Sequence, residues 1–285
     1  MQMTEFRNMP YTRPDLAAYG GKMRETAKTL REAKTYAEAR KAYFDLQQAG
    51  EEAETLFSIA YVRNTIDTRD AFYEAEVKYL QEEFARMIPL EKEYNEALAD
   101  CAFRADFEKE FGPQLFRQVD ASLRLADERI IADRIREGEL RQEYSKETAT
   151  ATIAFRGEEC NFYALLKHME SPDRAERKEA FQAWAALYAR ISPKLDAQYD
   201  ELVALRNRMA KTLGFGSYTE MAYLSRGHYD YTQEDTAAFR RQIREIVTPA
   251  VAEIRERQRQ RLGVEEIGDY QWKQEPRGDY SGSLP

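Results

Sequence analysis

The sequence predicts an all-α protein, an antiparallel helical bundle with one small β-hairpin. Before Gly263, apolar residues recur over most of the chain with the three- and four-residue spacing of helices that bury one face. The 285 residues include only 13 glycines and 9 prolines, which is few for the many turns of an all-β fold. A chain of this length can bury a sizeable core.

An N-terminal helical bundle is expected over residues 1–110. Pro14 can open the first helix, and Thr35 and Glu38 have the spacing of a capping box before the second. A third helix follows a short turn and is interrupted near Pro89. Long helices joined by short links favour antiparallel packing.

The segment 111–191 is predicted to be helical, with the hairpin near 150–163. Residues 150–155 are rich in β-formers, 156–159 resemble a turn, and 160–163 can return as the second strand. A lone hairpin is marginal in water, so we expect it to pack on helices.

Serine–proline pairs predict two helix starts, at Ser171-Pro172 and Ser192-Pro193. The second of these helices is expected to stop at Gly214, and Ser217 should cap the short helix that follows.

The remaining helical pattern should begin at Thr232 and kink at Pro249, completing a segment 192–262. The tail 263–285 is rich in glycine and lacks an apolar face, so we expect it to be irregular or disordered.

Composition limits the function classes. The net charge of −8 argues against nucleic acid or anionic lipid as a partner. No stretch predicts a membrane span or a secretory signal. Cys101 and Cys160 form neither a disulfide framework nor a metal set, so we expect two reduced, partly buried thiols in a cytoplasmic protein.

The sequence predicts no catalytic or metal-binding residue. Zinc hydrolysis on a helix needs two histidines four positions apart, and this chain has only His168 and His228. His168 is expected near a helix end, contacting terminal carbonyls. One predicted loop is rich in polar and aromatic residues. Its side chains either pack against the protein or contact a bound peptide: Tyr223, Arg226, His228, Tyr229 and Tyr231.

Several segments together are similar to a known family. They read NMPYTRPDL, NTIDTRDAFYEAE, FGPQLF, IAFRGEECNFYALL, SPDRAERKEAFQAW and LVALRNRMAKTLGFGSYTEMAYLSRGHYDY. In this order they resemble oligoendopeptidase F-like zinc metallopeptidases of the thimet oligopeptidase-like superfamily, from about Asn8 to Gly263.

The resemblance implies the N-terminal part of a channel-shaped helical peptidase, in which 192–262 begins the catalytic-domain helices. In the full-length family a zinc-bound water cleaves short peptides. The His-Glu-x-x-His helix and the further glutamate ligand match no position here. We therefore expect a truncated form, inactive alone and binding no zinc, whose partner is the missing catalytic half or a second copy.

The expected trace of such a role is apolar surface left exposed on helices over 193–213 and 233–262. A hypothesis of another class is an independent helical module that binds peptides or proteins without cutting them.

Overall fold

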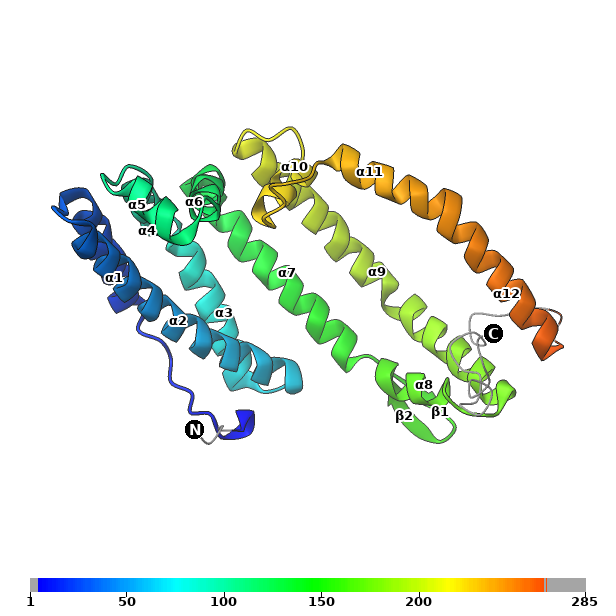
Figure 1. Cartoon of the computed structure of the whole chain (residues 1–285). Helices are drawn as coiled ribbons and strands as arrows, with labels where there is room; N and C mark the ends of the chain where they lie inside the picture. The colour runs from blue at the N-terminus through cyan, green and yellow to red at the C-terminus, as the bar shows by residue number, and fades with distance from the viewer. Residues whose placement is uncertain (1–4, 264, 266–285) are drawn as a thin grey trace. The chain divides into compact units, whose positions relative to one another are not determined.

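The computed structural model describes residues 5–263 and 265 and is helical apart from one two-stranded antiparallel sheet in that range (Figure 1). Short 3-10 turns at Phe6–Asn8 and Glu128–Ile130 precede α1 and α7. In chain order the helices and strands are α1 (Leu16–Glu32), α2 (Tyr36–Ile66), α3 (Ala71–Arg86), α4 (Ile88–Ala99), α5 (Arg104–Phe111), α6 (Gln114–Leu125), α7 (Ile131–Thr150), β1 (Thr152–Phe155), β2 (Glu158–Asn161), α8 (Phe162–His168), α9 (Arg174–Thr212), α10 (Tyr218–Ser225), α11 (Gln233–Gln242) and α12 (Thr248–Leu262), with a π-helical turn at Ile243–Val247.

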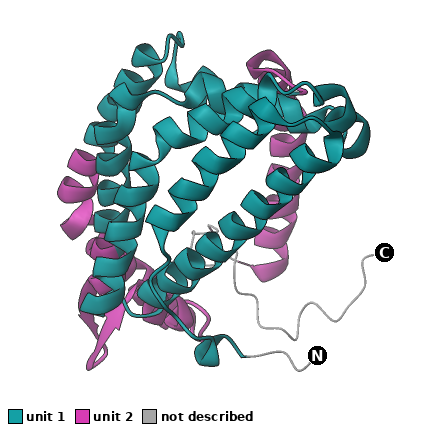
Figure 2. Ribbon diagram, turned by 90° about the vertical axis from the view of Figure 1, so that its left-hand side faces the viewer, with its two compact units in different colours: residues 1–145, 199–229 teal, residues 146–198, 230–285 magenta. Residues whose placement is uncertain are grey.

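The chain divides into two compact units, shown in different colours in Figure 2. Unit 1 comprises residues 1–145 and 199–229, and unit 2 comprises 146–198 and 230–285. Helix α9 contributes to both units, so the predicted boundary between 191 and 192 lies within one continuous helix.

The predicted N-terminal bundle is present in unit 1. Helix α1 packs against α2 and α4, α2 against α3, and α4 against α6. Their apolar stripes meet in one core that includes Met23, Leu30, Leu46, Leu80 and Phe107. The all-α bundle with a single hairpin is thus confirmed over the described residues.

Predicted caps and breaks explain where the bundle helices begin and end. The Thr35 side chain accepts a hydrogen bond from Glu38 N, as expected for the N-cap of α2. The Glu38 carboxylate instead accepts from Lys34 N, so the box is not reciprocal at Thr35. Pro89 lies in the first turn of α4, where a missing N–H costs little.

Ion pairs join α7 to the unit 1 part of α9. Arg136 Nε lies 2.6 Å from Glu201 Oε1, and Arg208 Nη2 lies 2.7 Å from Asp133 Oδ1. Another arginine, Arg206, donates to the largely buried Glu137 at 2.8 Å. Three arginine–carboxylate pairs therefore link these two helices.

The hairpin is present, but its second strand begins two residues earlier than predicted. Arg156 and Gly157 both have positive φ, at 49° and 89°, which closes a two-residue loop and pairs Phe155 with Glu158. Asn161 then caps α8 by accepting from Ala164 N. Phe162 and Tyr163, predicted as strand, are therefore helical.

The predicted helix start at Ser192-Pro193 is wrong, because α9 runs unbroken through it. Ser192 Oγ hydrogen-bonds the Asp196 carboxylate instead of capping a helix. Leu187, Ile191 and Leu195 continue one apolar stripe into the core of unit 2, and this burial offsets the backbone hydrogen bond that Pro193 cannot make. The other predicted start is shifted: α9 begins at Arg174, after Pro172, with the Asp173 carboxylate accepting from Ala175 N.

The C-terminal helices begin and bend where the sequence predicts. Thr232 and Asp235 form a reciprocal capping box at the start of α11. The π-helical turn Ile243–Val247 stands just before Pro249, which occupies the first turn of α12. None of the helices within the described residues has both the length and the apolar character of a membrane span. Except for residues 263 and 265, the predicted irregular tail lies outside the described residues.

Candidate functional site

The loop predicted to contact peptides is anchored on the core of unit 1. Gly214 has a φ of 82° and ends α9 as predicted, and Phe215 is buried. Ser217 caps α10 by accepting from Glu220 N, and α10 packs on α6 through Met221. The approach to the loop is therefore a fixed scaffold.

The structure brings Tyr223, near the end of α10, together with His228 in the loop that follows. Their rings meet edge to face with centroids 5.1 Å apart, and His228 N donates to Tyr223 O at 2.9 Å. Tyr229 is half-buried, whereas Arg226 is exposed. Tyr231 is also exposed, and it is assigned to unit 2. A peptide-contacting role for these five residues stays a prediction.

The N-terminal segment carries a charged cluster that periodicity alone does not reveal. Glu76 of α3 is 3% exposed, and its carboxylate accepts from Tyr11 Oη at 2.6 Å and from Arg13 Nε at 3.0 Å. Arg13 also lies over the Tyr79 ring, 4.2 Å from its centroid. The hydrogen bond from Arg13 holds the pKa of Glu76 below its usual value, and burial raises the pKa of Tyr11.

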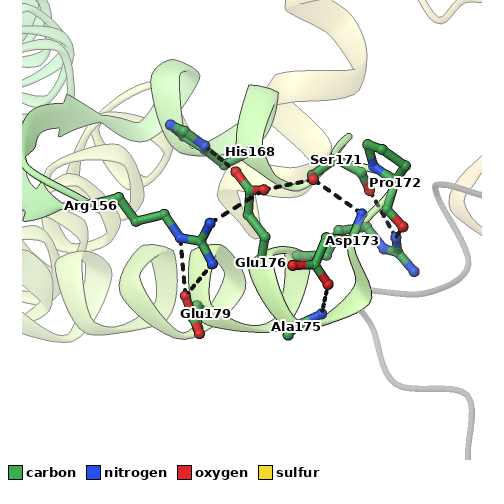
Figure 3. A network of polar contacts seen from close by, with 9 residues as sticks. Arg156, His168, Ser171, Pro172, Asp173, Ala175, Glu176 and Glu179 are labelled. Carbon is green, nitrogen blue, oxygen red and sulfur yellow. Dashed lines mark hydrogen bonds and ion pairs between the residues drawn. The ribbon is translucent and has the colours of Figure 1, made fainter.

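Unit 2 contains a polar network around the start of α9 (Figure 3). His168 ends α8 as predicted, but its Nδ1 lies 2.8 Å from Glu176 Oε1 and contacts a carboxylate rather than terminal carbonyls. The first turn of α9 brings Glu176 to the ring, where it also accepts from Ser171 Oγ at 2.7 Å. Hydrogen bonds from His168 and Ser171 lower the pKa of Glu176. Arg156 pairs with Glu179 at 2.7 Å and lies 3.4 Å from Glu176.

Helices α11 and α12 expose a continuous apolar face, as the sequence predicts for 233–262. No residue of α11, the π-helical turn or α12 is buried. Phe239, Ile246 and Ile254 are 61%, 66% and 55% exposed. With three- and four-residue spacing, the exposed large apolar side chains of this face, hereafter the C-terminal apolar face, are Phe239, Ile243, Ile246, Val247, Val251 and Ile254.

The other predicted apolar surface, over 193–213, is only partly exposed. Tyr199 and Val203 are exposed, whereas Leu205 and Met209 are buried in unit 1. The part of α9 in unit 1 thus has one face covered by its own unit.

Two family models match the chain. The model of the peptidase M3 N-terminal domain matches residues 6–126, and the model of peptidase family M3 matches residues 167–282. The chain belongs to peptidase family M3. The resemblance inferred from the quoted segments is therefore confirmed. No curated protein matches the chain.

Solved M3 structures share the fold at about one-third sequence identity. A structure solved under the name oligoendopeptidase F is 34% identical over 94% of this chain, with a TM-score of 0.90. PZ peptidase A, solved with an inhibitor, is 34% identical over 93%, also with a TM-score of 0.90. An oligoendopeptidase F structure from Bacillus anthracis is 30% identical over 95%, with a TM-score of 0.89. This chain spans 47%, 47% and 50% of those chains, about half their length.

Family M3 is zinc-dependent, but the residues of this chain do not fit the family's catalytic zinc site. His168 and His228 are the only histidines in the sequence, and they lie in different units. Neither belongs to a His-Glu-x-x-His helix, which would place two imidazoles on one helix face. No hydrolytic step can therefore be assigned to these residues.

Proposed function

We propose that this chain forms the substrate-channel portion of an oligoendopeptidase F-like zinc oligopeptidase that acts on short peptides. The similarity to solved M3 peptidases along nearly all of the chain supports this assignment. Because its two histidines are not spaced four positions apart on one helix to hold the catalytic metal, the chain is inactive by itself. Its two unpaired cysteines suit a reducing compartment such as the cytoplasm.

The observation that carries the proposal is the C-terminal apolar face. A two-turn or longer helix in a soluble fold normally buries one stripe, yet α11 and α12 bury none. Exposed contiguous apolar surface marks an interaction site. The occupant we propose is the rest of the M3 fold, because the chain spans only about half of its solved relatives.

In this proposal the wall that the peptide passes is lined by Tyr223 of α10 and by four residues that follow this helix, Arg226, His228, Tyr229 and Tyr231. Tyrosine supplies apolar area together with a hydroxyl group, and the exposed Arg226 supplies a cation for a peptide carboxylate. Replacement of Tyr231 and Arg226 by alanine should weaken peptide binding in the assembled enzyme without changing the helical content, as measured by circular dichroism.

The docking test adds the unmatched half of the Bacillus anthracis oligoendopeptidase F in trans. We expect a one-to-one complex by analytical ultracentrifugation and zinc-dependent cleavage of a short quenched peptide only when both parts are present. Replacing Phe239, Ile246 and Ile254 by serine should abolish the complex. Ile66→Ser is the matched control, since Ile66 is 73% exposed at the end of α2 and outside the face.

Other occupants of the face give different results in the same experiment. A homodimer that the triple serine variant dissociates would show that a second copy covers the face. Saturable binding of short peptides to the chain alone, without cleavage, would favour an independent binding module.

A further inference from the structure

Three metal-binding side chains converge beside the hairpin of unit 2. A carboxylate oxygen of Glu158, Sγ of Cys160 and a ring nitrogen of His168 all lie within 4.8 Å of one another. Cys160 is buried, His168 is half-buried and Glu158 is exposed. Three atoms with these separations lie within about 2.8 Å of a common point, so shifts of about 0.5–0.8 Å reach the bond lengths of a zinc site.

The local fold explains why these three residues meet. Glu158 and Cys160 are two positions apart on β2 and therefore project from the same side of the strand. Helix α8 begins directly after β2, and His168 is its last residue. The His168 ring rests edge to face on Phe155 of β1, with centroids 4.9 Å apart. The hairpin and the end of α8 thus hold the three donor groups together.

Glu176 orients the imidazole in the way a metal ligand requires. Its carboxylate is 2.8 Å from His168 Nδ1, and because a carboxylate only accepts, the tautomer that this contact favours donates from Nδ1 and leaves Nε2 for a metal. Metal-binding histidines almost always donate their other N–H to such a partner. Figure 3 shows the second ring nitrogen pointing away from Glu176. Ser171 fixes the same carboxylate with a hydrogen bond of 2.7 Å.

Glu158 and Cys160 have side chains available for this purpose. In the described part of the chain, neither makes a side-chain hydrogen bond or ion pair. By contrast, Glu159, the intervening residue on β2, accepts from Thr152 Oγ1 at 2.6 Å.

The same residues do not make a cysteine nucleophile. Cys160 is 1% exposed, and its Sγ has no hydrogen bond to His168 in the described structure. A catalytic thiol needs access to substrate and a base within hydrogen-bonding reach. A small ion, in contrast, can enter past the exposed Glu158.

We propose that Glu158, Cys160 and His168 bind a zinc-class divalent cation that ties the hairpin to α8, with water as the fourth ligand. A thiolate and an imidazole together select zinc, cobalt or cadmium over magnesium or calcium. The site is structural, and it is separate from the family's His-Glu-x-x-His centre. Binding releases the thiol proton to solvent and involves no redox change. Because a two-stranded hairpin is marginal alone, the ion raises the stability of this part of unit 2.

The experiment uses the untagged full chain, freed of metal and titrated with Co²⁺ and then with Zn²⁺. We expect one Co²⁺ per chain, a thiolate-to-cobalt charge-transfer absorption, and displacement of that signal by Zn²⁺. The chain provides matched controls, because it has two cysteines and two histidines. Cys160→Ser and His168→Gln should each weaken Co²⁺ binding at least tenfold, whereas Cys101→Ser and His228→Gln should leave it unchanged.

Glu158→Gln should weaken binding less, and Glu159→Gln, on the opposite side of β2, should have no effect. Circular dichroism checks that each variant folds, and Glu158→Gln, at an exposed position, keeps the test valid if Cys160→Ser unfolds. Absence of the charge-transfer band in the folded wild-type chain overturns the proposal. Equal loss of binding in Cys101→Ser or His228→Gln also overturns it, because the ion would then sit elsewhere.

Discussion

The N-terminal bundle and the C-terminal helices α11 and α12 use similar amphipathic sequences with opposite results. In the bundle, the stripes of α1 to α6 bury a shared core, and Leu80 and Phe107 are fully enclosed. In α11 and α12 the stripe has the same spacing, but every large apolar residue on it is exposed.

The difference shows that helix formation and burial are separate requirements. Helix α11 has a reciprocal capping box at Thr232 and α12 ends at Gly263 in the left-handed region, so both ends are well specified locally. Local signals define these helices, and in the proposed function the rest of the M3 fold supplies the surface that covers them. The bundle needs no such addition.

Truncating a large apolar side chain should give the largest difference in unfolding free energy between the N-terminal bundle and helices α11 and α12. Leu80→Ala should lower the free energy of unfolding by about 2–5 kcal/mol, because it leaves a cavity in a closed core. Ile254→Ala, at an exposed position, should change it by less than about 0.5 kcal/mol. Urea unfolding followed by circular dichroism measures both. Similar losses for the two variants would mean that the C-terminal face is covered within the chain.

When the complementary half covers the C-terminal apolar face, Ile254→Ala should have a large effect in place of a small one. In complex with the complementary half of an M3 peptidase, Ile254→Ala should weaken association by about 2 kcal/mol, because an exposed side chain has become an interface residue. Isothermal titration gives the affinity, with Ile66→Ala as the exposed control outside the face. An unchanged affinity would place the docking surface elsewhere.

The buried Glu76 cluster should give the stability of the bundle a pH-dependent component. Glu76→Gln should cost about 1–3 kcal/mol at neutral pH, because the charged hydrogen bond from Arg13 is weakened. The folded pKa of Glu76 lies below the unfolded value of about 4.3, so its contribution is complete above that value and is lost as pH falls through the folded pKa.

The difference between wild type and Glu76→Gln should therefore be constant above about pH 5 and shrink at lower pH. Urea unfolding of the two proteins in parallel cancels the titration of other carboxyl groups. A difference that grows on acidification has the wrong sign and would refute the role assigned to Arg13.

Removing a helix cap should give the smallest difference between the two regions. Thr35→Ala removes the N-cap of α2 and should cost about 1 kcal/mol in global unfolding, because α2 forms part of the core. Thr232→Ala removes the cap of α11 and should instead increase amide exchange within α11 while leaving global unfolding nearly unchanged. Hydrogen exchange by mass spectrometry distinguishes the two effects.

Caps, breaks and apolar stripes were predictable because they depend on neighbours in sequence. Thr35, Gly214 and Thr232 act where the pattern places them. The continuation of α9 through Ser192-Pro193 was not predictable from neighbouring residues. Burial of Leu187 and Ile191 in the core of unit 2 outweighs the local signal for a helix break. The turn at Arg156-Gly157 was placed too broadly, because positive φ at Arg156 is not evident from its residue type.

Polar clusters were the least predictable features. Tyr11 and Arg13 contact Glu76, which lies more than sixty positions away in the sequence. His168 contacts Glu176 because the turn between α8 and α9 brings the two helix ends together. Spacing on one helix cannot reveal such pairs. The Ser-x-x-x-x-Glu arrangement of Ser171 and Glu176 gave no usable signal.

The central claim is that this chain supplies the wall of an M3 peptidase without its catalytic metal site. The most direct measurement is hydrolysis of a short quenched fluorescent peptide by the purified chain in zinc-containing buffer, with and without a chelator. We predict no chelator-sensitive cleavage by the chain alone and its appearance when the complementary half is added. Zinc-dependent cleavage by the chain alone that is lost in a His168→Gln and His228→Gln double variant would contradict the account.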